Sequence, residues 1–288
     1  MDIQGLFRGL TQNQYGILCS AGEAELSYPE DGNALCFGLE DRSFWFRHRN
    51  EIIAETIKRY PPSCHPILDI GGGNGFVTRR LLDEGFQTVL IEPGRVGAWN
   101  AKVRREIPWV VCSTLEESGL PDESVGAVGC FDVLEHIEKD REFLQNVMRV
   151  LKPGGLFYLA VPARRWLWSH MDIVAGHYRR YDHRTLTSLF QQDAEILYFT
   201  HFFGWLTLPL FLLKALPSRL GILKHENVFT YETEHGVDNS AISSILTFLL
   251  HGEVKMVRNG GSKKLGTSCL LVARKRECQK NGNASDHL

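Results

Sequence analysis

The stretch Ile67-Leu-Asp-Ile-Gly-Gly-Gly-Asn-Gly-Phe76 decides the fold. An apolar run carries the acid Asp69, and the glycines at 71, 73 and 75 alternate before a helix-like segment begins. A buried strand, a glycine turn and a helix start form, in this order, the usual site for a nucleotide-like ligand in an α/β domain. The glycines accept backbone angles that a side chain resists, and they let the main chain approach a ligand closely.

The spacing of these glycines is not that of a dinucleotide site. A G-x-G-x-x-G pattern that starts at Gly71 requires a glycine at position 76, where the chain has Phe76. A nicotinamide-dependent dehydrogenase is therefore a weak alternative.

Composition sets broad limits on the function. The chain has 288 residues, 43% of them hydrophobic and 23% charged, which is ordinary for a globular protein. A formal net charge of −2 disfavours nucleic acid as the main substrate. The seven cysteines form no C-x-x-C pair, so the usual signature of a zinc or redox site is missing. An odd cysteine count without a signal peptide favours a cytoplasmic location.

Strands and helices alternate after Pro66, which predicts a mostly parallel sheet covered by helices on both faces. The predicted helices include 76–83, one that Asp140 caps, and one that Asp182 caps. Residues 1 to about 40 lack periodicity, so irregular structure is expected there. The predicted strands are 67–70, 88–91, 109–112, 125–131, 156–161, 194–199 and 267–274.

Four motifs in order resemble the class I S-adenosylmethionine-dependent methyltransferases over roughly residues 44–275. They are the Asp69 and glycine motif, Glu92 at the end of the second strand, Phe131-Asp-Val-Leu-Glu-His-Ile137, and Leu151-Lys-Pro-Gly-Gly155. The resemblance implies a Rossmann-like fold, with a central, mostly parallel seven-stranded sheet whose last strand is antiparallel. Two departures are Thr114, where many relatives have an aspartate, and Val125-Gly126, where many have Phe-Asp.

The resemblance implies S-adenosylmethionine as the cofactor and no metal. Asp69 is expected to orient the methionine end, the glycine loop to offer N–H groups at a helix N-terminus, and Glu92 to accept from both ribose hydroxyls. The adenine is expected near Thr114 and Leu115. The full set of predicted cofactor residues is Asp69, Gly71, Gly72, Gly73, Asn74, Gly75, Glu92, Pro93, Thr114, Leu115, Phe131 and Asp132.

Methyl transfer requires alignment and exclusion of water, and needs a base only if the nucleophile must lose a proton. His136 and His177 are the candidate bases, and a structural role is the alternative for each. His177 and Tyr181 belong to a Gly-His-x-Arg-Arg-Tyr phrase that resembles a bacterial-type subset of class I enzymes, and Tyr181 is a further catalytic candidate that is expected to contact the acceptor with His177. Together with Trp168, this region is predicted to form the substrate mouth, with Arg180 binding an anionic group or only holding the loop.

The predicted organisation is an N-terminal segment with a lid helix over 1–60, a methyltransferase domain over 61–276, and a disordered tail over 277–288. Trp45 and Arg49 precede the core and are candidates for a lid, although the aromatic side chain is expected to pack on the core. Residues about 202–260 are predicted as an insertion. Its segment 202–217 either contacts a membrane surface or, as favoured here, packs over the substrate pocket.

The predicted function is metal-independent transfer of a methyl group from S-adenosylmethionine to a small-molecule or lipid-like acceptor. One alternative is a non-catalytic protein that binds S-adenosylmethionine as a regulator or partner. Another is a methyltransferase that acts on protein or RNA.

Overall fold

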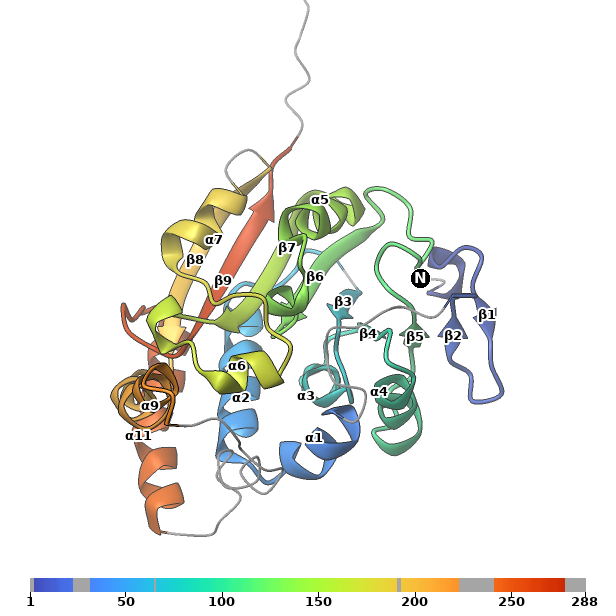
Figure 1. The fold of residues 1–288 in the computed structure, drawn as a ribbon. Coiled ribbons are helices and arrows are strands. Elements are labelled where there is room, and N and C mark those ends of the chain that lie inside the picture. Colours follow the sequence, from blue (N-terminus) through green and yellow to red (C-terminus); the bar gives the residue numbers. More distant parts are fainter. Residues whose placement is uncertain (1–2, 23–31, 65, 191–192, 223–240, 278–288) are drawn as a thin grey trace, which may run out of the picture.

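The computed structural model describes residues 3–22, 32–64, 66–190, 193–222 and 241–277. Within the last range, only the helical backbone is described for residues 241–249. The predicted tail over 277–288 lies outside the described residues except for Glu277. The central sheet has the order β1-β2-β5-β4-β3-β6-β7-β9-β8, and its core contains the seven predicted strands (Figure 1). These are β3 (Ile67–Ile70), β4 (Thr88–Ile91), β5 (Val110–Cys112), β6 (Val125–Phe131), β7 (Leu151–Pro162), β8 (Ala194–Phe202) and β9 (Ser268–Lys275).

The strand directions confirm the predicted fold class. Strands β5, β4, β3, β6 and β7 are mutually parallel, and β9 runs antiparallel to both β7 and β8. All four residues of β3 and of β4 are buried, as expected for strands that are covered on both faces. Strand β7 begins at Leu151, earlier than predicted, because Leu151 pairs with Val125 ahead of an irregularity in the register.

The expectation of irregular structure before residue 40 was wrong. The short strands β1 (Thr11–Gln12) and β2 (Leu18–Cys19) extend the sheet beyond β5, and α1 (Gly32–Glu40) forms a helix. Two-residue strands carry no readable periodicity, since it is the pairing of β1 with β2 and of β2 with β5 that creates them.

Helices cover both faces of the sheet, and each face has its own hydrophobic cluster. One face packs against α2 (Phe44–Arg59), α3 (Phe76–Asp83) and α11 (Ala241–Arg258), and the other against α5 (Asp140–Val150) and α7 (His183–Leu189). The shorter elements are η1 (Gln4–Leu6), α4 (Arg95–Trp99), η2 (Asn100–Arg104), η3 (Leu134–His136), η4 (Arg165–Leu167), α6 (His170–Val174), η5 (Gly204–Leu206), α8 (Thr207–Leu210), η6 (Phe211–Ala215) and α9 (Leu216–Arg219).

The two predicted helix caps had different outcomes. Asp182 caps α7 by accepting a hydrogen bond from the N–H of Thr185, as predicted. Asp140 is not a cap, because it lies inside the first turn of α5. Its carboxylate instead accepts from the Tyr181 hydroxyl at 3.0 Å and pairs with Arg179 at 2.6 Å. A tertiary contact has therefore replaced the local one.

Gly126 has a structural reason for departing from the Phe-Asp of many relatives. A Cβ atom at this position would overlap the sulfur and the carbonyl oxygen of Cys64. The segment before β3 therefore crosses β6 at a distance that only glycine permits.

Candidate cofactor and acceptor site

A cavity of about 670 Å³ opens at the carboxyl ends of β3, β4 and β6. The chain leaves β3 toward β4 on one side and returns to β6 on the other, so the sheet order reverses between β3 and β6. Such a switch point is where open α/β sheets bind ligands. Helices α1 and α6 lie beyond this end of the sheet (Figure 1).

The glycine loop lines the cavity and is packed tightly from behind. A Cβ on Gly71 would lie 2.5 Å from Cγ2 of Val133, and one on Gly72 would lie 2.9 Å from a carboxylate oxygen of Asp69. The N–H groups of Gly71 and Gly73 donate to the Ile91 carbonyl and to Glu92. The loop therefore contributes close approach of the main chain, and these two N–H groups are already used inside the protein.

Two buried carboxylates stand at this end of the cavity. Asp69 accepts a hydrogen bond from Thr78 at 2.5 Å, and Glu92 accepts from the N–H groups of Gly73 at 2.8 Å and Gly94 at 2.7 Å. Burial raises the pKa of Asp69 to about 6 and that of Glu92 to about 7, against the hydrogen bonds that favour the charged forms. Both groups are acceptors suited to hydroxyl or ammonium donors of a ligand.

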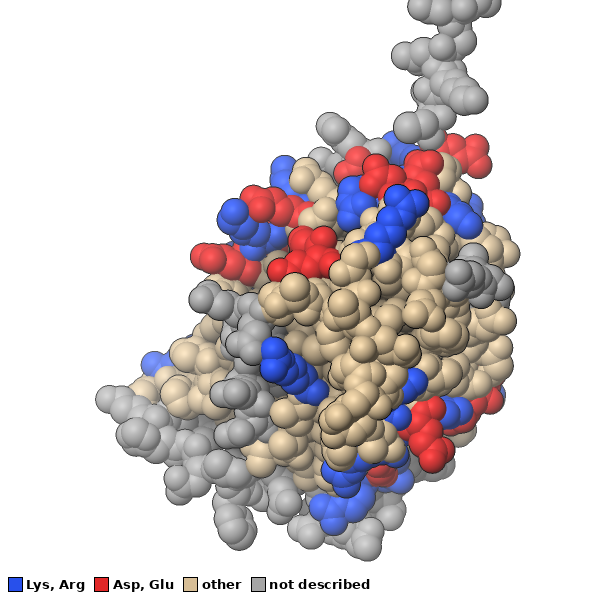
Figure 2. Space-filling model, turned by 90° about the vertical axis from the view of Figure 1, so that its right-hand side faces the viewer, with Lys and Arg blue, Asp and Glu red and all other residues tan. Residues whose placement is uncertain are grey.

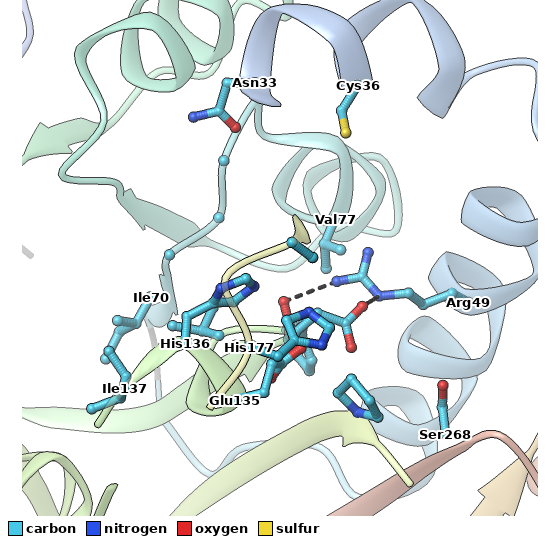
Figure 3. Close-up of a pocket in the computed structure, with 18 of the residues that line it drawn as sticks. Asn33, Cys36, Arg49, Ile70, Val77, Glu135, His136, Ile137, His177 and Ser268 are labelled. Carbon is cyan, nitrogen blue, oxygen red and sulfur yellow. Dashed lines mark hydrogen bonds and ion pairs between the residues drawn. The ribbon is translucent and has the colours of Figure 1, made fainter. Parts of the chain in front are cut away.

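Helix α1 supplies residues that the sequence prediction missed. Asn33, Cys36 and Glu40 line the cavity, and Asn33 contributes a hydrogen bond to Glu92. Figure 3 shows Asn33 and Cys36 at one end of the cavity, opposite the histidines. The spacing of Cys36 and Leu39, which are both buried, is a weak helical signal in a segment otherwise expected to be irregular.

The structure brings most predicted cofactor residues together but leaves two outside. Asn74 and Gly75 do not line the cavity. The Asn74 amide instead donates to Glu40 and to the Asn33 carbonyl, which ties α1 to the loop. The predicted residues that line the cavity are Asp69, Gly71, Gly72, Gly73, Glu92, Pro93, Thr114, Leu115, Phe131 and Asp132.

The two lid candidates on α2 both line the cavity but have different partners. Trp45 stacks on Phe203 with ring centroids 3.9 Å apart, in agreement with the expected packing role. Arg49 pairs with Asp132 at 2.5 Å and donates to the Phe131 carbonyl at 2.9 Å (Figure 3). Asp132 has a positive φ of 56°. Such a conformation is uncommon for aspartate and is often found at functional sites.

His136 and His177 meet at the other end of the cavity, with ring centroids 4.7 Å apart. Burial lowers the pKa of His136 to about 4, so its imidazole is neutral at pH 7. The Nδ1 atom of His177 lies 3.0 Å from a carboxylate oxygen of Asp172, which also accepts from Arg180 at 2.7 Å. Arg180 lines the cavity, but this ion pair also holds the loop.

The cavity does not include two residues that were predicted to bind the substrate. Tyr181 is buried, and its hydroxyl bonds to Asp140 and to the Leu134 carbonyl, so it holds the loop rather than facing an acceptor. Trp168 is also not among the lining residues. The order of the residues after Gly176 does not show which of their side chains point into the cavity.

The segment 202–217 has two sides. Leu210 and Lys214 line the cavity, as expected for an insertion over the pocket. Its other side leaves large apolar residues in solvent, with Leu208 63% and Leu213 69% exposed. Other exposed apolar residues are Trp205 and Leu212 on this segment, Leu220 and Ile222 just after it, and Trp166, Ile173 and Val174 on the loop after β7. Trp166 packs edge-on against Phe211, which joins the two loops.

Charge is not concentrated on the face beyond the β1 edge. Figure 2 shows uncharged residues over the centre of this face, with acidic and basic residues intermixed around it. This face therefore lacks the broad basic surface that a nucleic acid requires. No helix within the described ranges is long and apolar enough to cross a membrane.

Comparison with known proteins supports the motif interpretation. Residues 68–159 match the family model of the methyltransferase domain. A probable S-adenosylmethionine-dependent methyltransferase of Mycolicibacterium smegmatis is 27% identical over 136 residues, 47% of this chain and 52% of the relative. A ubiquinone biosynthesis O-methyltransferase of Bradyrhizobium is 32% identical over 39% of this chain and 46% of the relative. The chain thus spans about half the length of the curated relatives that it matches.

Solved structures agree in fold. The Haemonchus contortus phosphoethanolamine N-methyltransferase 2, in complex with S-adenosyl-L-methionine, aligns with a TM-score of 0.51 at 17% identity, covering 87% of this chain and 58% of that one. A methyltransferase of Thermotoga maritima aligns with a TM-score of 0.50 at 13% identity, covering 84% and 93%. The chain therefore has the class I methyltransferase fold. Within that fold, residues 68–159 match the methyltransferase domain and resemble S-adenosylmethionine-dependent methyltransferases in sequence.

Proposed function

We propose that this chain catalyses transfer of a methyl group from S-adenosylmethionine to a small-molecule or lipid-like acceptor. The observation that carries the proposal is the cavity itself. It joins the glycine loop and Glu92 at one end to His136 and His177 at the other. A volume of about 670 Å³ lies within the range of small-molecule sites.

The residues present fit the cofactor. A Cβ atom on Gly71 would overlap Val133, and one on Gly72 would overlap Asp69. Only glycine therefore fits at these two positions of the cavity wall. Glu92 is placed to accept from ribose hydroxyls, and Asp69 and Arg49 carry the charges that an amino acid end requires. Thr114 and Leu115 line the cavity where the adenine is predicted. These assignments remain predictions for each residue.

S-adenosylmethionine supplies a methyl carbon on a positively charged sulfur, which is already an activated leaving group. The protein must therefore align the acceptor in line with this carbon and exclude water. Leu210 and Phe143 add apolar surface to the cavity wall, and His177 is held in one orientation by Asp172. A histidine so oriented is suited to remove a proton from an acceptor.

A lipid-like acceptor is favoured by the surroundings of the cavity. The segment that contributes Leu210 and Lys214 to its wall also exposes Leu208 and Leu213 on the outside. Exposed apolar side chains on a segment that also lines a pocket fit a site that meets a membrane or an apolar ligand. Because Lys214 stands at the same wall, an anionic head group would be compatible with it.

The first experiment is isothermal titration of the purified chain with S-adenosylmethionine, with NADH as the control. We expect saturable binding of S-adenosylmethionine alone. Release of S-adenosylhomocysteine is then measured with a lipid extract, a small-molecule extract, and a protein or RNA fraction. Binding without turnover on any fraction would favour a non-catalytic regulator, and turnover only on protein or RNA would replace the proposed acceptor class.

A further inference from the structure

Three potential metal ligands meet at the histidine end of the cavity, where the acceptor is proposed to bind. They are Glu135 and His136 from η3, after β6, and His177 from the loop after β7. One ligand atom from each residue lies within 4.8 Å of the others. Figure 3 shows Glu135, His136 and His177 close together in the cavity. Glu135 and His136 are neighbours in the sequence, whereas His177 is 41 residues further on, and the parallel arrangement of β6 and β7 brings the two loops to the same edge.

Glu135 is the least expected member of this cluster. Its side chain is fully buried, and no group outside the residue donates a hydrogen bond to either carboxylate oxygen among the described residues. The nearby cations are engaged elsewhere, Arg49 with Asp132 and Arg180 with Asp172. A buried carboxylate without a hydrogen-bond donor is unfavourable unless a cation or a proton compensates it.

His177 has the second contact that metal-binding histidines commonly show. Its Nδ1 lies 3.0 Å from Asp172, a fully buried carboxylate that is itself held by Arg180. With the Nδ1 proton donated to Asp172, the Nε2 atom is the acceptor that remains for a ligand. A carboxylate behind a histidine fixes the tautomer and the ring orientation of a metal ligand. His136 adds a second imidazole, a common ligand of divalent first-row metals, beside Glu135 and His177.

We propose that Glu135, His136 and His177 bind one divalent first-row metal ion, and that the ion takes a hydroxyl oxygen of the acceptor as a further ligand. Two imidazoles and one carboxylate are a ligand set suited to Zn²⁺ or Fe²⁺, and they leave coordination positions open. This inference rests on the proposed function. It replaces the metal-independent mechanism that the sequence had suggested, and it replaces the role of His177 as a base by that of a metal ligand. It assigns the acceptor atom as oxygen.

The chemistry of this step is balanced. The ion lowers the pKa of the bound hydroxyl, whose proton leaves to water. The resulting oxygen forms a bond to the methyl carbon as the sulfur–carbon bond breaks. That electron pair stays on sulfur and gives the neutral thioether. No oxidant or reductant is required.

The test uses the full chain after treatment with a chelator and dialysis. Zn²⁺ is titrated by calorimetry into the wild type and into Glu135→Gln, His177→Ala and Asp172→Asn. We expect one equivalent of Zn²⁺ to bind. Affinity should fall at least 10-fold in the first two variants and roughly 10–100-fold when Asp172 is replaced. His183→Ala is the matched control, since His183 is exposed and does not line the cavity.

Two further measurements separate the explanations. The Co²⁺-substituted chain should show a visible spectrum without a thiolate charge-transfer band, which excludes binding by cysteines such as Cys36. Equal Zn²⁺ affinity in wild type and Glu135→Gln, or no stoichiometric binding, would overturn the proposal. S-adenosylmethionine is titrated into the same metal-free protein. If it binds while Zn²⁺ does not, only the metal site is wrong. If it does not bind, the proposed function fails independently.

Discussion

Replacing Gly71 with alanine tests whether the glycine loop is required by backbone conformation, by packing, or by both. Gly71 has a φ of +66°, and its Cβ would lie 2.5 Å from Cγ2 of Val133. A left-handed conformation costs alanine about 1–2 kcal/mol. Overpacking against the side chain of Val133 adds about 1–3 kcal/mol. We therefore expect Gly71→Ala to lower the free energy of unfolding by roughly 2–5 kcal/mol.

The matched control is Gly85→Ala. Gly85 has a similar φ of +87°, but nothing lies within 4 Å of its Cβ position. This variant should lose only the backbone contribution of about 1–2 kcal/mol and should bind S-adenosylmethionine as the wild type does. The difference between the two variants measures the packing contribution at Gly71.

Denaturant unfolding and calorimetry on the two variants, on Val133→Ala and on Gly71→Ala/Val133→Ala complete the cycle. Removing the methyl groups of Val133 should relieve the overlap, with a coupling energy of about 1–3 kcal/mol. If Gly71→Ala is no less stable than Gly85→Ala, or if the coupling is zero, the account of the loop given above is refuted.

Four other outcomes are expected. Glu92→Ala should weaken S-adenosylmethionine binding by about 1–3 kcal/mol in calorimetry, and unchanged affinity would place the ribose acceptor elsewhere. Because burial raises the pKa of Glu92 to about 7 from 4.5, the folded state binds more protons between these values, so this carboxyl makes stability fall as pH rises through that window. Glu92→Gln should flatten that dependence in unfolding curves measured from pH 5 to 8, and an unaltered slope would contradict the assignment. His177→Ala should reduce turnover far more than cofactor affinity, whereas equal losses in both assays would indicate a purely structural histidine. Leu208→Glu should reduce sedimentation with anionic phospholipid vesicles while Val103→Glu, an exposed apolar position on η2, should not; equal binding by both variants would count against a membrane contact.

The strand and helix pattern from Ile67 to Val161 was predictable because its signals are local. Buried parallel strands read as apolar runs, and glycines mark the turns between strands and helices. The bounds of β3, β4, β6 and α3 agree with the prediction for this reason. The order of four motifs then indicated the fold class, and the acids Asp69 and Glu92 lie at the cavity as expected.

The acceptor end was less predictable, since it depends on which side chains of two loops point inward. His177 and Tyr181 are four residues apart, but one lines the cavity and the other lies in the core. The Asp172 contact to His177 and the Asp140 contact to Tyr181 make this difference. Neither acid carries a sequence signal that identifies its partner.

The sequence by itself determined the class of fold and the glycine turn, and it predicted the place of the cofactor along the chain, because each follows from residues that are neighbours in sequence. Only the tertiary structure decided that α1 closes the cavity through Asn33 and that Glu135 is buried beside two histidines. It also decided that segment 202–217 faces both the cavity and solvent. These features arise from contacts between distant segments, whose energies depend on packing and burial rather than on local periodicity.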